Sequence, residues 1–89
     1  MNETDLKIFE LIKLLQSLGT IKYEYDFADS VGILKQTLTK IKMGTAHFRT
    51  EHIKRICEVF NVNANWIFGL ENKVFNSLKT QKNKEFQEQ

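Results

Sequence analysis

Apolar residues recur at helical spacing near the start of the chain. The pattern predicts a helix from about Asp5 to Leu18, capped at Thr4 or Asp5 and ended by Gly19. Its apolar positions are Ile8, Leu11, Ile12, Leu15 and Leu18, widened by Leu6, Phe9 and Leu14. Such a wide arc fits a helix with core on two sides, or one that shares surface with a partner; we favour core.

Two shorter helices are predicted next, over about 23–31 and 34–42, with Gly32 in the turn between them. Ala28 lies four residues before Gly32, where its methyl group lets the helices cross closely, and Gly32 can adopt the positive φ of a short turn. Apolar positions that fix both helices to one core are Phe27, Val31, Ile33, Leu38 and Ile41. We infer a helix-turn-helix whose second helix ends at Gly44 and presents Lys35, Gln36, Thr37, Thr39 and Lys40 outward.

The following pattern predicts a loop over 45–49 and a fourth helix with Thr50 as its N-cap. The inward residues of that helix are Ile53, Ile56, Cys57 and Phe60. Asn61 or Asn63 ends it and caps a short fifth helix, which contains Ala64, Trp66, Ile67 and Phe68 and ends near Gly69. We therefore expect a compact all-α domain of five helices over about 1–70, with the helix-turn-helix at 23–42.

The last part of the chain, residues 71–89, has a different composition, rich in Lys, Gln, Asn and Glu. Val74, Phe75 and Leu78 have the spacing of one apolar stripe on a possible sixth helix. The stripe either folds back on its own domain or pairs with a second copy, and we favour a homodimer built by these three residues.

Net charge is +2 overall but is unevenly distributed along the sequence. Residues 1–32 carry −3, residues 33–55 carry +5, and residues 56–89 are neutral. Because the positive charge lies on the outward helix and the segment after it, the sequence favours a surface that binds a polyanion.

The composition excludes several other classes of protein. Eighty-nine residues with 42% hydrophobic content suffice for one folded domain, and the single Cys57 cannot form an internal disulfide. We find no metal-ligand spacing, no glycine-rich phosphate loop and no nucleophile beside a base, so we expect no cofactor, no metal, no small-molecule ligand and no enzyme activity. The first apolar stretch is interrupted by charges, so we expect no membrane span and a cytoplasmic, nucleoid-associated protein.

The segment from Phe27 to Gly44 resembles the helix-turn-helix of phage-repressor and Cro-like DNA-binding domains. The ending Asn61-Val62-Asn63-Ala64-Asn65-Trp66-Ile67-Phe68-Gly69 resembles the short closing helix of those domains, so the likeness covers roughly residues 5–70. The resemblance implies a third helix that lies in the major groove of double-stranded DNA, usually as a dimer on a two-fold site.

The resemblance also implies which residues contact DNA. Those expected at base edges are Lys35, Gln36, Thr37 and Lys40. Those expected at the DNA backbone are Tyr23, Thr39, Lys42, Thr45, His47 and Arg49. The chain departs from the family at Leu34, which leaves the third helix without a capping side chain, and at Glu24, whose carboxylate would be repelled by phosphate. The chain also lacks the proline often found after the third helix.

These observations leave two functions open. The first is a sequence-specific transcriptional regulator, most simply a repressor. The second is a protein-interaction module on the same fold, such as an antitoxin-like or anti-repressor partner with weak DNA binding, which Glu24 and the wide apolar face of the first helix would suit.

Overall fold

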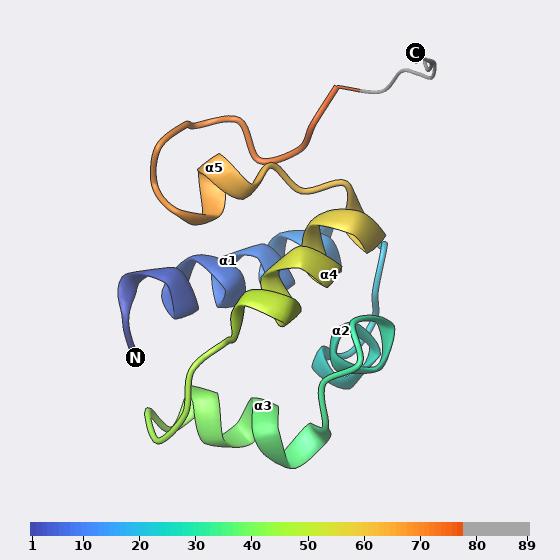
Figure 1. The fold of residues 1–89 in the computed structure, drawn as a ribbon. Helices are drawn as coiled ribbons and strands as arrows, with labels where there is room; N and C mark the ends of the chain where they lie inside the picture. Colours follow the sequence, from blue (N-terminus) through green and yellow to red (C-terminus); the bar gives the residue numbers. More distant parts are fainter. Residues whose placement is uncertain (78–89) are drawn as a thin grey trace.

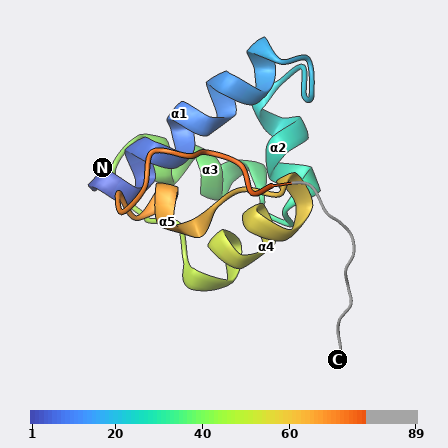
Figure 2. The ribbon, with the colours of Figure 1, turned by 90° about the horizontal axis from the view of Figure 1, so that it is seen from above.

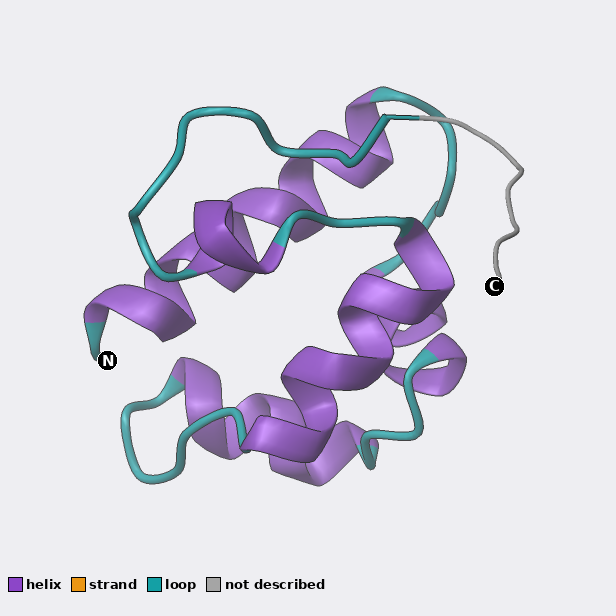
Figure 3. Cartoon of the chain, turned by 45° about the horizontal axis from the view of Figure 1, so that its top comes forward, coloured by secondary structure: helices purple, strands orange, loops and turns teal. Residues whose placement is uncertain are grey.

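A computed structural model describes residues 1–77, and over this range it confirms the all-α fold. Its helices are α1 (Glu3–Ser17), α2 (Glu24–Ser30), α3 (Lys35–Lys42), α4 (Thr50–Phe60) and α5 (Ala64–Ile67). In Figure 1, α3 lies along the lower edge of the molecule, α1 and α4 lie across the middle, and α5 lies above them. Figure 2 shows α1 and α2 meeting at a sharp angle, and Figure 3 shows that loops join all five helices.

The helix starts differ from the predicted ones at two places. Helix α1 begins earlier than expected because Asn2, not Thr4 or Asp5, is the N-cap, and its side chain accepts a hydrogen bond from the Asp5 amide at 2.8 Å. Helix α4 has Arg49 as its N-cap rather than Thr50. The Arg49 amide donates to Nδ1 of His52 at 3.0 Å, so an imidazole three residues later satisfies this end of the helix.

One continuous core joins the five helices. Four of the eight apolar positions expected on α1 are buried and Leu6 is 56% exposed, whereas on the other helices the fully buried residues include Phe27, Val31, Ile41 and Ile56. The rings of Phe27 and Phe60 stack with centroids 5.5 Å apart, which ties α2 to the end of α4. Leu18 was expected on the buried face and is 59% exposed instead, because α1 ends at Ser17 and the chain turns away at Gly19.

The turn between α2 and α3 has the predicted geometry. Gly32 has a φ of +72°, and the amide of Ile33 donates to the carbonyl oxygen of Ala28 at 2.8 Å. Ala28 is buried where the two helices approach. Leu34 caps α3 without a side-chain hydrogen bond, as its residue type implied.

The segment after α5 differs from the sixth helix that the sequence predicted. Residues 71–77 are not helical; they return across the molecule and form one antiparallel bridge between Val62 and Phe75. The amide of Asn63 donates to the Val74 carbonyl at 2.8 Å, and the amide of Asn76 donates to the Asn61 carbonyl at 2.9 Å.

Two asparagines, Asn61 in a turn and Asn63 in the core, explain why the 71–77 segment runs back across the molecule. Asn61 ends α4 in the left-handed conformation, with a φ of +56°, and Asn63 caps α5 through the Asn65 amide. The Asn63 amide group also donates to the Glu71 carboxylate and, at 2.9 Å, to the Lys73 carbonyl. These local hydrogen bonds hold the segment extended, and hydrophobic periodicity carries no information about them.

No helix within residues 1–77 has the length and apolar character needed to cross a membrane.

Candidate nucleic-acid interface

Helix α3 presents a polar face to solvent. Leu38 and Ile41 are buried beneath it, whereas Lys35, Gln36 and Lys40 are exposed. Thr39 is exposed as well, but its hydroxyl donates to the Lys35 carbonyl at 3.1 Å, so it is already used within the helix. Thr37 is only half-exposed, at the edge of the core. Three of the four expected base-contacting side chains are therefore exposed on this face.

Two contacts fix the orientation of α3 against α2. Near the C-terminal end of α3, Lys42 forms an ion pair with Glu24 of α2. Near its N-terminal end, the Lys35 ammonium lies 5.1 Å from the ring centre of Tyr25. A cleft of about 180 Å³ lies between these contacts, with Leu38 among its lining residues. The ion pair also bears on Glu24, the acid at which the chain departs from the phage-repressor pattern. Lys42 neutralises its carboxylate within the protein.

Two stacked tyrosines at the start of α2 have a lysine against each ring. The rings of Tyr23 and Tyr25 are stacked 5.1 Å apart with an interplanar angle of 11°. The Lys22 ammonium lies 5.4 Å from the ring centre of Tyr23, whereas the Lys35 ammonium lies over the ring of Tyr25. Both tyrosines keep more than 40% exposure, so the stack is a surface feature with one lysine ammonium against each ring, and the Lys35 ammonium lies at the start of α3.

The loop after α3 is anchored by a buried acid that the sequence interpretation missed. Asp5 is 1% exposed, and it accepts hydrogen bonds from the Phe48 amide at 3.1 Å and from Nδ1 of His47 at 2.7 Å. The Asn2-x-x-Asp5 spacing was the available signal, because that pattern is a capping box. His47, expected on phosphate, is thus held by α1, and its side chain is 57% exposed.

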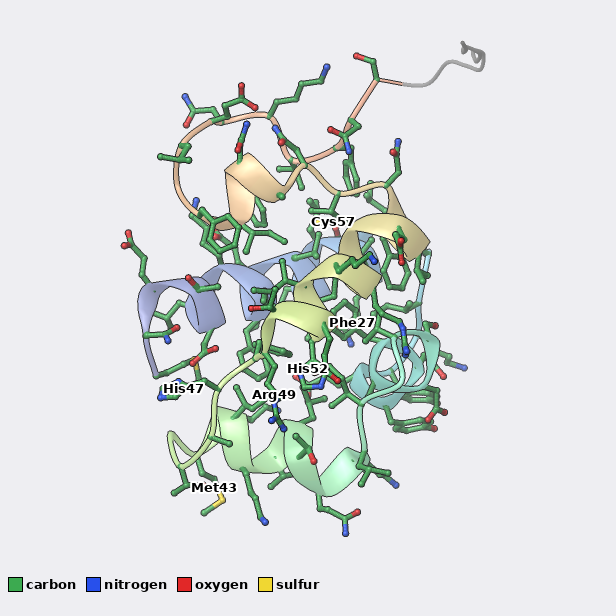
Figure 4. The ribbon with its side chains drawn as sticks, in the orientation of Figure 1. Phe27, Met43, His47, Arg49, His52 and Cys57 are labelled. Atoms are coloured by element: carbon green, nitrogen blue, oxygen red, sulfur yellow. The ribbon has the colours of Figure 1, made fainter. Side chains whose placement is uncertain are left out.

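Thr45 and Arg49 lie at the two ends of the same loop. The Lys40 carbonyl near the end of α3 accepts two hydrogen bonds from Thr45, one from its amide at 2.9 Å and one from its hydroxyl at 3.1 Å. Arg49 is exposed at the start of α4, and Figure 4 shows its side chain between α4 and α3, near His52. The arginine is therefore close to the helix that would enter the groove.

His52 adds a titratable group to this region. Burial lowers the pKa of His52; Glu51 acts in the opposite direction, and Arg49 and Arg55 lower the pKa further. The neutral ring is the form that can accept the Arg49 amide, so this cap needs an unprotonated His52.

Two apolar side chains flank the polar face of α3. Leu34, just before the helix, is 67% exposed, and Met43, just after it, is 73% exposed. Figure 4 shows Met43 at the lower edge of the molecule, beyond the end of α3. The sequence predicted only that Leu34 leaves α3 without a capping side chain. The structure adds that this side chain is exposed directly before Lys35.

The positive charge predicted for residues 33–55 is less concentrated than the sequence implied. Lys42 is paired with Glu24, and Arg55 donates from Nη1 to the Val31 carbonyl at 3.3 Å. Lys54 lines a groove beside α5, on another part of the surface. The cations left around α3 without an ion pair, within the part of the chain that the structure describes, are Lys35, Lys40 and Arg49.

All ten expected DNA-contacting residues therefore lie on α2, α3 and the loop after α3 or at the ends of these elements, apart from the expected dimer residues. The group around α2, α3 and the following loop consists of Tyr23, Lys35, Gln36, Thr37, Thr39, Lys40, Lys42, Thr45, His47 and Arg49. Val74 and Phe75 are half-buried against their own core, and Leu78 lies outside the described residues.

No protein-family model, curated protein or solved structure matches this chain. Among residues 1–77, no group of three or more His, Cys, Asp or Glu side chains is arranged to hold a metal ion.

Proposed function

We propose that this protein binds double-stranded DNA in a sequence-specific manner, by inserting α3 into the major groove, and that it acts as a transcriptional regulator of the repressor kind. The observation that carries the proposal is the exposed face of α3, which presents Lys35, Gln36 and Lys40 while Leu38 and Ile41 are buried beneath it. The resemblance to phage-repressor and Cro-like domains supports the same function.

The phosphate contacts would give affinity without sequence preference. Lys35, Lys40 and Arg49 bring positive charge to the groove edge, and each phosphate that they neutralise releases counterions, so affinity falls as salt rises. Tyr23 offers an exposed hydroxyl group beside α3, whereas the Thr45 hydroxyl already donates to the Lys40 carbonyl. The Asp5 anchor keeps the 45–49 loop in place, which lowers the entropy lost when the loop contacts the backbone.

The base contacts would give discrimination. Gln36 can bond adenine at N6 and N7, and Lys35 or Lys40 can donate to O6 and N7 of guanine, each good pair contributing ~1–3 kcal/mol. Leu34 extends the list, because an exposed apolar side chain at the N-terminal end of the groove helix suits the methyl group of thymine. A protein bound in this way across a promoter would repress by excluding the polymerase.

The deciding experiment is selection of random duplex DNA by the purified chain at near-physiological salt. We expect an enriched site, with two-fold symmetry if the protein binds as a homodimer. An enriched asymmetric site would indicate a bound monomer. If no site is enriched while circular dichroism shows a helical, cooperatively melting protein, the DNA proposal fails and the protein-interaction module becomes the better hypothesis.

A further inference from the structure

An apolar groove lies between α4 and α5, away from the interface described above. Its volume is about 480 Å³, and its apolar lining comes from Ile53, Cys57, Ala64 and Phe68. Phe68 is 53% exposed at the end of α5, so an aromatic ring remains in contact with water. These side chains form a small apolar patch bordered by polar groups, which a second surface of matching shape can cover.

Two opposite charges border the groove on α4. Lys54 and Glu58 also line it, one helical turn apart, and both are exposed. Within residues 1–77 neither side chain forms an ion pair. The groove therefore has an apolar side at α5 and a charged side on α4, where positive Lys54 is followed by negative Glu58 toward the C-terminal end of the helix.

This charge order is self-complementary under a two-fold axis perpendicular to α4. Such an axis reverses the direction of the second α4, so that Lys54 of one copy lies opposite Glu58 of the other, and the same pair recurs by symmetry. The apolar flanks meet on the same side, which brings the two Phe68 rings toward each other. A parallel arrangement would instead place like charges together.

We propose that the α4–α5 groove is the contact surface for a second copy of this chain, with the two α4 helices antiparallel. This surface replaces the expected stripe of Val74, Phe75 and Leu78. Val74 and Phe75 already pack against their own core. The groove, in contrast, leaves the ring of Phe68 open to a partner.

The same axis would place the two α3 helices suitably for DNA. This consequence, unlike the dimer itself, rests on the proposed function. Figure 1 shows α5 and α3 on opposite sides of α4, and Arg55 of α4 donates to the carbonyl of Val31 at the end of α2. An axis running from the α5 side to the α3 side leaves both α3 helices at the same end of the dimer. Dimers that bind palindromic half-sites require that arrangement.

The first test measures self-association of the full chain without DNA, by sedimentation equilibrium over a range of concentrations. We expect a monomer–dimer equilibrium. The substitutions Lys54→Glu and Glu58→Lys should each raise the dimer dissociation constant about tenfold, because each converts two symmetry-related attractions into repulsions. The double variant K54E/E58K should return to within about twofold of the original value, since it restores both pairs with reversed sign.

A matched control separates this effect from overall charge. Lys13→Glu makes the same charge change at an exposed position of α1 and should leave the dissociation constant unchanged. Circular dichroism of every variant establishes that the helices are intact. A chain that is monomeric at all concentrations overturns the proposal, as does a dimer that neither single substitution weakens.

The second test uses Cys57, the single cysteine of the chain, as a position marker. In the antiparallel arrangement the two Cys57 side chains lie near the axis, so a short bis-maleimide should link two copies, and Phe68→Ser should abolish the product. Cross-linking that survives Phe68→Ser contradicts the assigned surface. Because no DNA is present in either test, failure of the dimer and failure of DNA binding are distinguished.

Discussion

Lys42 of α3 and Glu24 of α2 form an ion pair that spans the two helices of the helix-turn-helix. The side chains keep 50% and 37% exposure, so the pair lies at the surface, beside the face that we propose enters the groove. A surface pair of this kind contributes little to folding, at most about 1 kcal/mol. At the proposed interface, its larger effect is to withhold the Lys42 ammonium from phosphate.

Replacing Glu24 with Gln should therefore strengthen DNA binding. The freed Lys42 can neutralise a phosphate, so we expect about fivefold tighter binding at low salt and a salt-dependence slope that is steeper by about one. Titrations of a selected duplex at several salt concentrations give both values. Glu10→Gln, the same change on an exposed position of α1, should alter neither; equal effects of the two substitutions would mean that only net charge matters.

Gln36→Ala and Arg49→Ala should change DNA binding in different ways, the first altering base preference and the second altering overall affinity. Loss of Gln36 should flatten the preference at one base pair by ~1–3 kcal/mol and leave the others unchanged. Loss of Arg49 should weaken binding to every sequence and reduce the salt slope by about one. Repeating the selection with each variant measures both effects. A preference that is unchanged in Gln36→Ala would remove that residue from the base contacts.

Leu34→Thr should separate folding from recognition. Threonine supplies the capping oxygen that α3 lacks, so we expect the free energy of unfolding to rise by about 1 kcal/mol. The loss of apolar contact with a thymine methyl should lower the preference for thymine at one position by about 0.8 kcal/mol. Urea unfolding and competition between thymine- and uracil-containing duplexes measure the two effects. If the original protein does not distinguish thymine from uracil, Leu34 has no such contact.

Gly32→Ala should destabilise the fold more than Gly19→Ala. Both glycines have positive φ, which costs an alanine about 1 kcal/mol. At Gly32 the new methyl would lie 2.4 Å from Nη1 of Arg55, whereas at Gly19 it would meet nothing within 4 Å. Displacing Arg55 breaks its bond to Val31 and adds about 1 kcal/mol. Urea unfolding measures both changes, and in an Arg55→Ala background the two substitutions should cost the same.

His52 should make the start of α4 sensitive to acid. Because the pKa of His52 is lowered in the folded state, the unfolded chain takes up this proton at a higher pH, near 6.5, than the folded chain does. Stability should consequently fall as the pH drops through 6.5 toward the lower pKa of the folded state. Glutamine at this position also bonds back to the N-cap amide but does not titrate, so His52→Gln should reduce the loss of melting temperature between pH 7.5 and 5.5. An equal loss in both proteins would assign the acid sensitivity to other groups.

Hydrophobic spacing was enough to predict the helices and most of the core. The buried residues of α2, α3 and α4, among them Phe27, Leu38 and Ile56, lie where their periodicity placed them. The predicted turn residue, Gly32, has the positive φ that its position required. These features depend on local backbone geometry and on the burial of one helix face, both of which a sequence records directly.

The helix ends were less predictable because they depend on competing hydrogen bonds. Thr50 and Asn2 are both good capping residues by type, yet only Asn2 acts as a cap, while His52 satisfies the amide at the start of α4. Asp5 has the spacing of a capping-box acid, but its burial against His47 and Phe48 joins residues more than forty positions apart.

The sequence by itself determined the all-α class, the helix-turn-helix and the outward residues of α3, because these follow from residue type and from spacing within one helix. Only the tertiary structure decided that Lys42 is paired, that Arg55 serves the turn, and that Val74 and Phe75 lie on their own core. Each of these contacts depends on which group, distant in the sequence, lies next to the charge, the carbonyl or the apolar surface in the folded chain. Such contacts are set by the packing of helices in space, which no local pattern specifies.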